Sequence, residues 1–119
     1  MWAAGSGGRV VVDWDRVCEL RQEIGNEDFN EVLHLFLDEA DEVIARLGAA
    51  GDAASLESDL HCLKGSALNL GLTDLARICQ DGERHAAAGS IAVSVPEVAR
   101  CYRLSRESLV QGLVRLDAA

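Results

Sequence analysis

The segment LESDLHCLKGSALNLGL (residues 56–72) decides the fold of this chain, because apolar residues recur in it at the spacing of an α-helix. One sector of that helix, at about 100° per residue, collects the apolar side chains Leu56, Leu60, Leu63, Ala67 and Leu70. His61 points about 150° away from the middle of this sector by the same count. Lys64 and Gly65, one turn further on, share its face. The pattern therefore predicts a histidine that is exposed to solvent.

The composition predicts an all-α chain with one domain. The 119 residues can enclose one hydrophobic core, and 49% of them are apolar but only 4% aromatic. Alanine and leucine favour helices, whereas the residues that favour strands are scarce outside positions 9–12 and 91–95. We expect residues 1–12 to be a flexible leader and residues 13–119 to form the domain.

Periodicity and end signals predict five helices. Their expected ranges are 14–24, 26–47, 52–69, 74–88, and 96 to the end of the chain. Asp13 and Thr73 are the expected N-caps of the first and fourth helices, and Gly25 and Gly71 are stop signals. Connections this short make consecutive helices antiparallel. The expected fold is an antiparallel up-down-up-down four-helix bundle with a short N-terminal capping helix.

The same periodicity predicts which side chains face the core. The expected faces are Trp14, Val17, Leu20 and Ile24 in the first helix; Phe29, Val32, Phe36, Ala40, Val43 and Leu47 in the second; Leu75, Ile78 and Cys79 in the fourth; and Val98, Tyr102, Ser105, Leu109, Gly112 or Leu113, and Leu116 in the last.

Acidic residues outnumber basic ones, which limits the class of partner. Twenty Asp and Glu against eleven Lys and Arg give a formal net charge of −9. No basic stripe is available for nucleic-acid phosphates or for an anionic membrane surface. No apolar run approaches the roughly 20 residues that span a bilayer, and residues 1–8 do not resemble a signal peptide. We expect a cytoplasmic monomer that binds neither nucleic acid nor membranes.

The motif H-x-x-K-G-S-x-x-x-x-G, from His61 to Gly71, resembles the signature of histidine phosphotransfer (HPt) domains, the intermediate carriers of multistep phosphorelays. The similarity covers most of the chain: an amphipathic helix before the motif, a Leu-Ala-x-x-Cys helix after it, and a long final helix. The resemblance implies the same bundle fold. It also implies partners, namely response-regulator receiver domains or a hybrid sensor kinase. Because receiver domains bring their own Mg²⁺, we expect no metal and no cofactor on this chain.

His61 is the expected phosphoacceptor. A neutral imidazole nitrogen can attack the phosphorus of an aspartyl phosphate, and the phosphohistidine can pass the group to another aspartate. Lys64 is expected to neutralise phosphoryl charge and to favour the neutral imidazole. The sequence contains no glycine-rich nucleotide loop and no kinase signature. We therefore predict a phosphocarrier and not an ATP-dependent kinase.

Gly65 and Leu68 are candidate docking residues. Glycine inside a helix costs about 1 kcal/mol relative to alanine, and the close approach of a receiver would explain it; packing against a neighbouring helix is the alternative. Leu68 lies near the direction of His61 and would join the same surface. Ser66 and Asn69 are expected to have structural roles, and Gly71 to end the helix.

Glu83 is a candidate for contact with the site. It matches a position at which HPt domains carry Glu or Gln facing the histidine. Gly82, just before it, departs from the apolar residue that is usual there, which leaves the local packing of this helix open.

Two further groups of residues have a structural interpretation. His34 and His85 could be imagined as metal ligands together with His61, but Glu31-x-x-His34 occurs once and has no second copy. We expect both to be surface histidines. The cysteines form no C-x-x-C pair and are expected to be reduced thiols: Cys18, Cys62, Cys79 and Cys101.

Other functions remain open at this point. A non-catalytic helical adaptor could dock receiver or kinase domains without phosphotransfer, although it would not need His61, Lys64 and Gly65 together. The chain could also be the phosphotransfer domain of a larger hybrid or chemotaxis-type kinase.

Overall fold

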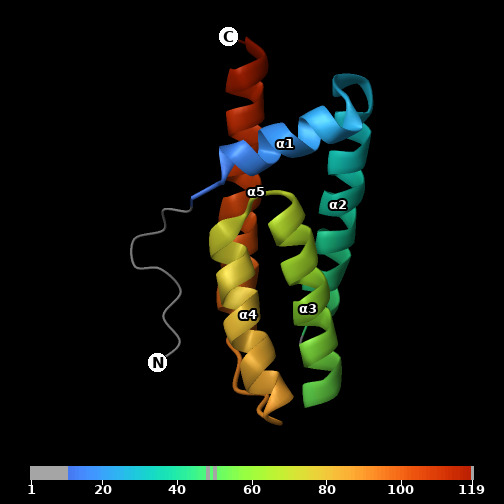
Figure 1. Ribbon diagram of the computed structural model, residues 1–119. Coiled ribbons are helices and arrows are strands. Elements are labelled where there is room, and N and C mark those ends of the chain that lie inside the picture. Colours follow the sequence, from blue (N-terminus) through green and yellow to red (C-terminus); the bar gives the residue numbers. More distant parts are fainter. Residues whose placement is uncertain (1–10, 48, 50, 119) are drawn as a thin grey trace.

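The computed structural model describes residues 11–47, 49 and 51–118, and every regular element in that part of the chain is an α-helix. The helices are α1 (Trp14–Ile24), α2 (Asn26–Arg46), α3 (Ala53–Asn69), α4 (Thr73–Ala87) and α5 (Val95–Ala118). Figure 1 shows α2 to α5 extending along the long axis of the molecule, with α1 lying across their upper part. The all-α prediction is confirmed.

The helix ends follow local sequence signals with one exception. Asp13 caps α1 by accepting a hydrogen bond from a backbone N–H of its first turn, as predicted. Gly25 separates α1 from α2 with a φ of 95°, a conformation that favours glycine. The prediction of Thr73 as an N-cap is wrong, because Thr73 is the first residue of α4 and its hydroxyl donates instead to the Val11 carbonyl at 3.1 Å.

The predicted core faces are confirmed for most of the chain, and α2 is the main correction. Leu33 and Leu37 are buried, whereas Val32 and Phe36 are only partly buried. The buried stripe of α2 is therefore displaced by one position in its middle. On this side of α2 the Tyr102 hydroxyl of α5 lies within hydrogen-bond distance of Asp41 Oδ1 and of the Leu37 carbonyl oxygen, so α5 contributes to covering it.

The end of α5 is the second correction. Leu116 is 45% exposed, although the pattern placed it in the core. In Figure 1 the last turns of α5 extend beyond α1, where no other helix is drawn beside them. A periodic pattern reports the apolar side of a helix, but burial also requires a neighbour to cover it.

The segment before α1 is attached to the bundle. Val12 is buried and forms an isolated β-bridge with Leu72. The backbone N–H of Val11 donates to Asp74 Oδ2 at 2.7 Å. The predicted leader of residues 1–12 thus ends in two anchored residues; its first ten residues lie outside the described part of the chain.

The helix α1 also packs on α5. A Cβ at Gly112 would lie 2.1 Å from the ring of Trp14, so the absence of a side chain lets the indole lie against α5. Arg21 of α1 forms an ion pair with Asp117 of α5 at 2.8 Å. Together these contacts hold α1 against α5.

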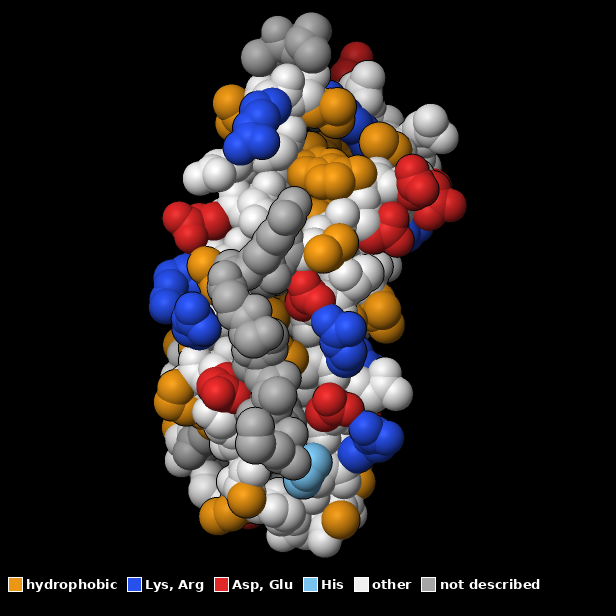
Figure 2. Space-filling model, turned by 90° about the vertical axis from the view of Figure 1, so that its left-hand side faces the viewer, with side chains coloured by type: hydrophobic (Ala, Val, Ile, Leu, Met, Phe, Trp, Pro, Cys, Tyr) orange, Lys and Arg blue, Asp and Glu red, His pale blue; other side chains and the backbone are white. Residues whose placement is uncertain are grey.

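Two surface properties bear on the class of partner. None of the described helices is long and apolar enough to cross a membrane. On the face drawn in Figure 2, basic side chains are interspersed with acidic ones. On α4, Arg84 forms an ion pair with Asp81 at 2.6 Å.

Candidate functional site

His61 lies in the middle of α3 and is exposed, as predicted, with 69% of its side chain accessible to solvent. Its Nδ1 atom is 2.9 Å from Oε2 of Glu83 on α4. The two residues are 22 positions apart in the sequence and meet because α3 and α4 pack closely along their length. One ring nitrogen is therefore occupied by the protein and the other is left for a partner.

Glu83 contacts both ionisable side chains of the motif. Its Oε1 atom lies 2.9 Å from Lys64 Nζ, while its Oε2 atom contacts His61. Burial by itself would raise the pKa of the Glu83 carboxyl group. Hydrogen bonds and positive charge from Lys64 and His61 have the larger, opposite effect, so that the pKa lies below its ordinary value. The carboxyl group is consequently ionised at neutral pH.

The charge of Glu83 fixes the proton on the imidazole. An ionised carboxylate can only accept hydrogen bonds, so Nδ1 of His61 must be the donor in this pair. In a neutral ring the unprotonated nitrogen is then Nε2, and its lone pair is free for nucleophilic attack. The arrangement is that of an oriented nucleophile.

Lys64 lies between the site and a groove. Its side chain is 22% exposed and its ammonium is paired with Glu83. An open groove of about 370 Å³ begins beside it, between α3 and α4, and is lined by Lys64, Leu68, Thr73, Ala76, Arg77, Gln80 and Asp81. The Lys64 ammonium is thus linked to the His61 imidazole through the Glu83 carboxylate, which contacts both of them.

Gly65 leaves open space next to His61. A Cβ built there would meet no atom within 4 Å beyond the local backbone of its own helix. Packing against a neighbouring helix, the alternative reason for this glycine, is therefore wrong. Because glycine has no side chain, the face of α3 that carries the histidine has no bulky group at this position.

Two leucines on the α2 and α3 surface are exposed. Leu68 of α3 is 57% exposed and Leu35 of α2 is 63% exposed. Leu35 is not among the sequence-predicted site residues; its position outside the apolar stripe of α2 is the only sequence signal for it. We refer to Leu35, Gly65 and Leu68 as the apolar patch.

The pairing of α2 with α3 places Leu35 on the Gly65 side of His61. Cys62 Sγ donates to Glu39 Oε1 at 3.4 Å, and Arg46 Nε donates to Asp59 Oδ1 at 3.0 Å. Residue numbers thus rise along one helix and fall along the other. Leu35, one turn before Glu39, therefore lies beyond Cys62 in the direction of Leu68.

The remaining motif residues have structural contacts, as expected. Ser66 is buried, and Asn69 Nδ2 donates to the Gly65 carbonyl at 3.1 Å. Gly71 has a φ of 72°, and a Cβ there would lie 2.5 Å from the Asp13 carbonyl oxygen. Glycine is thus required both for the turn after α3 and for the close approach of the segment before α1.

Gly82, the departure from the HPt pattern, is buried within α4, which continues through it without interruption.

His34 is exposed, and His85 Nδ1 lies 2.8 Å from the Asp81 carbonyl oxygen. Over the part of the chain that the structure describes, no three His, Cys, Asp or Glu side chains are arranged to hold a metal ion.

The cysteines do not offer a second nucleophile in the site. All four are free thiols. Burial raises the pKa of Cys79 to about 12 and also raises the pKa of Cys101. Burial and the neighbouring Glu39 carboxylate raise the pKa of Cys62, the thiol next to His61 in the sequence. The raised pKa keeps these three thiols protonated and unreactive.

Comparison with protein-family models identifies the class. The Hpt domain model matches residues 31–119, so the chain belongs to the Hpt domain family. Hpt domains carry phosphoryl groups on histidine in phosphorelays, are not themselves kinases, and interact with receiver domains and kinases. No curated protein and no solved structure that was compared matches the chain. The helix α1 lies outside the matched residues.

Proposed function

We propose that this chain is a phosphocarrier in which His61 accepts a phosphoryl group from a receiver aspartate and passes it to an aspartate of another receiver. The observation that carries the proposal is the contact of 2.9 Å between His61 Nδ1 and the ionised Glu83. The exposed histidine, the adjacent lysine and the open surface over Gly65 support it.

The transfer follows from the orientation of the imidazole. The Nε2 lone pair forms a bond to phosphorus while the bond from phosphorus to the aspartyl oxygen breaks, and the carboxylate leaves. The Nδ1 proton stays on the ring, which becomes positively charged as the Nε2–P bond forms. Glu83 faces that developing charge and stabilises it. Lys64 supplies positive charge near the phosphoryl oxygens, and Mg²⁺ belongs to the partner receiver.

The apolar patch is the proposed docking site of the receiver. Interfaces of this kind have an apolar centre and a polar rim, and the patch lies one turn from His61. We also propose that α2 to α5 constitute the antiparallel up-down-up-down bundle expected for the family, with α1 as its cap; the course of the chain in Figure 1 supports this.

The decisive experiment separates a carrier from a kinase and from an adaptor. Radiolabelled ATP alone should not label the chain, whereas a phosphorylated cognate receiver should produce an acid-labile, base-stable label that His61→Gln abolishes. Candidate donors are the phosphorylated receivers of the source organism, screened individually. Labelling by ATP alone would contradict the proposal, as would full labelling of His61→Gln. A receiver that binds without transfer would support the adaptor function instead.

A further inference from the structure

The helix α1 lies outside the residues that match the family, yet it is attached to the end of the helix that carries His61. The backbone N–H of Asp13, directly before α1, donates to the Gly71 carbonyl at 2.7 Å. Arg16 Nη2 donates to Asn69 Oδ1 at 3.5 Å. These two contacts attach α1 to the C-terminal end of α3. The apolar patch lies on the same side of His61.

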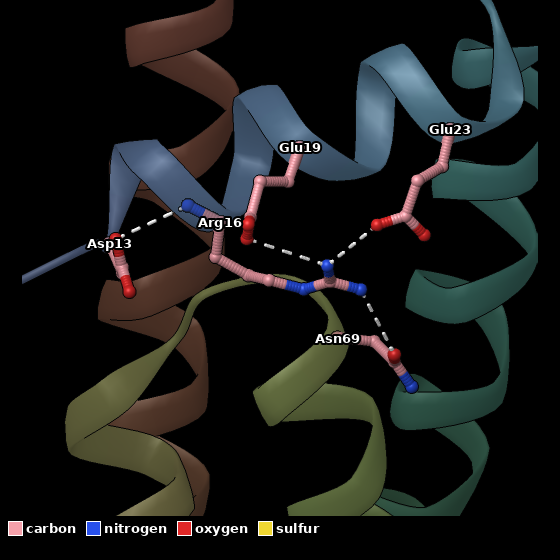
Figure 3. Close-up of polar contacts among 5 residues, drawn as sticks. All are labelled: Asp13, Arg16, Glu19, Glu23 and Asn69. Carbon is pink, nitrogen blue, oxygen red and sulfur yellow. Dashed lines mark hydrogen bonds and ion pairs between the residues drawn. The ribbon is translucent and has the colours of Figure 1, made fainter.

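Arg16 holds two carboxylates beside Asn69. Its Nη1 atom lies 3.1 Å from Glu23 Oε1 and 3.7 Å from Glu19 Oε1. Figure 3 shows both glutamates projecting from α1 toward the guanidinium group, with Asn69 on the other side of it. The glutamates are 65% and 62% exposed, whereas Arg16 is 26% exposed. The cluster therefore presents net negative charge to solvent.

The size of a docking interface places this cluster within reach of the receiver. A transient but specific interface buries about 600–800 Å² on each partner, which corresponds to a disc of about 14–16 Å radius. Asn69 is eight residues beyond His61, and at 1.5 Å per residue this is about 12 Å along the helix. An interface centred on His61 would already reach Asn69.

The apolar patch moves the centre of the interface further toward α1. Its three residues lie on the α1 side of His61, and the apolar residues of an interface occupy its centre. On the opposite side of His61 the exposed surface of α3 includes Ser58 and Ala54, without a large apolar side chain. The polar rim of the interface consequently falls on the Arg16 cluster.

We propose that α1 forms the rim of the receiver docking surface and that Glu19 and Glu23 select a receiver with basic side chains opposite them. The inference rests on the proposed function, because its partner is the receiver that exchanges phosphate with His61. Complementary rim charges raise the rate of productive encounter, and like charges suppress the wrong partners. A helix outside the matched residues thus determines which receiver this carrier accepts.

The test compares two double variants that have the same net charge. Glu19→Gln with Glu23→Gln removes the rim carboxylates, and Glu27→Gln with Glu107→Gln removes two exposed carboxylates outside the Arg16 cluster. For transfer from a receiver that labels the wild-type chain, kcat/KM of the rim variant should fall several-fold at low salt, with kcat unchanged. The control should match the wild type, and the difference should shrink as salt screens the charges.

A binding measurement locates the contact without any chemistry. In isotopically labelled chain carrying His61→Gln, addition of the same receiver should shift the backbone amide resonances of α1 together with those of α3. Equal kinetics for the rim variant and its control, or a receiver that shifts α3 but leaves α1 unchanged, would overturn the inference while phosphotransfer to the wild type stands. Failure of every receiver to label the wild type would overturn the proposed function and this inference with it.

Discussion

Glu83 is the residue on which the site depends, because it contacts both His61 and Lys64. Its pKa lies below its ordinary value in the folded chain, so the folded state holds this carboxyl group ionised more strongly than the unfolded state does. Such a group stabilises the fold above its unfolded pKa, and the stabilisation is lost as pH falls through the folded pKa.

Comparison of the wild type with Glu83→Gln should reveal this linkage. The difference in the free energy of unfolding should shrink as pH falls below about 4.3, the ordinary pKa of a glutamate. Urea unfolding of both proteins between pH 7 and pH 3 measures it. A difference that does not change with pH would show that the charge of Glu83 is not coupled to folding.

Lys64 is expected to act on the phosphoryl group, and its substitution separates charge from structure. Lys64→Ala should slow transfer or shorten the lifetime of the phosphohistidine. The loss of stability should be no more than about 1 kcal/mol, because the lost ion pair is partly exposed and alanine is a good helix former. Lys64→Arg should retain part of the function, since the charge survives. Transfer kinetics and a melting curve on each variant test this; an unchanged rate and lifetime in Lys64→Ala would contradict the charge role.

At the scale of elements, two motif glycines, one inside α3 and one in the turn after it, have different reasons to be glycine. Gly65→Ala should raise stability by up to about 1 kcal/mol, because the position is helical and a Cβ there is unobstructed. Gly71→Ala should lower it by about 1–3 kcal/mol, because of the positive φ and the Asp13 carbonyl. Urea unfolding of this matched pair should give changes of opposite sign. If both substitutions changed the stability in the same direction, the different structural reasons given for the two glycines would be contradicted.

The open surface of α3 should be sensitive to bulk. Gly65→Gln should keep the fold, because glutamine is a better helix former than glycine. It should nevertheless block transfer, since the new side chain occupies the apolar patch. The measurement is the transfer rate from a phosphorylated receiver, with Gly65→Ala as the small-residue control. A folded Gly65→Gln protein that transfers at the normal rate would show that receivers approach elsewhere.

At the scale of the whole molecule, α1 contributes to the core although it lies outside the family match. Val17 and Leu20 are 2% and 6% exposed. Burial of one such side chain contributes about 1.5–3 kcal/mol, so deletion of residues 1–24 should cost several kcal/mol. Denaturant unfolding of the truncated and full chains tests this. Equal midpoints and slopes would show that α1 is not part of the cooperative unit.

The sequence by itself determined the helices and the exposure of His61, because both follow from relations between residues three or four positions apart. Glycine and capping signals located most of the helix ends for the same local reason. The displaced stripe of α2 and the exposed Leu116 show the limit of this reasoning. Periodicity identifies an apolar side, but neighbouring elements decide how much of it is covered.

Only the tertiary structure decided what surrounds the histidine. The contact of His61 with Glu83 spans 22 positions, and that of Arg16 with Asn69 spans 53. Resemblance to a family indicated Glu83. The apolar pattern of α2 could only have marked Leu35 as lying outside the stripe, and no local pattern could place Leu35 or Arg16 near the site, because their neighbours are set by how whole helices pack. The same holds for Gly71, which the sequence identifies as a helix stop. Its second constraint, the Asp13 carbonyl against its Cα, exists only because the chain before α1 returns to the end of α3.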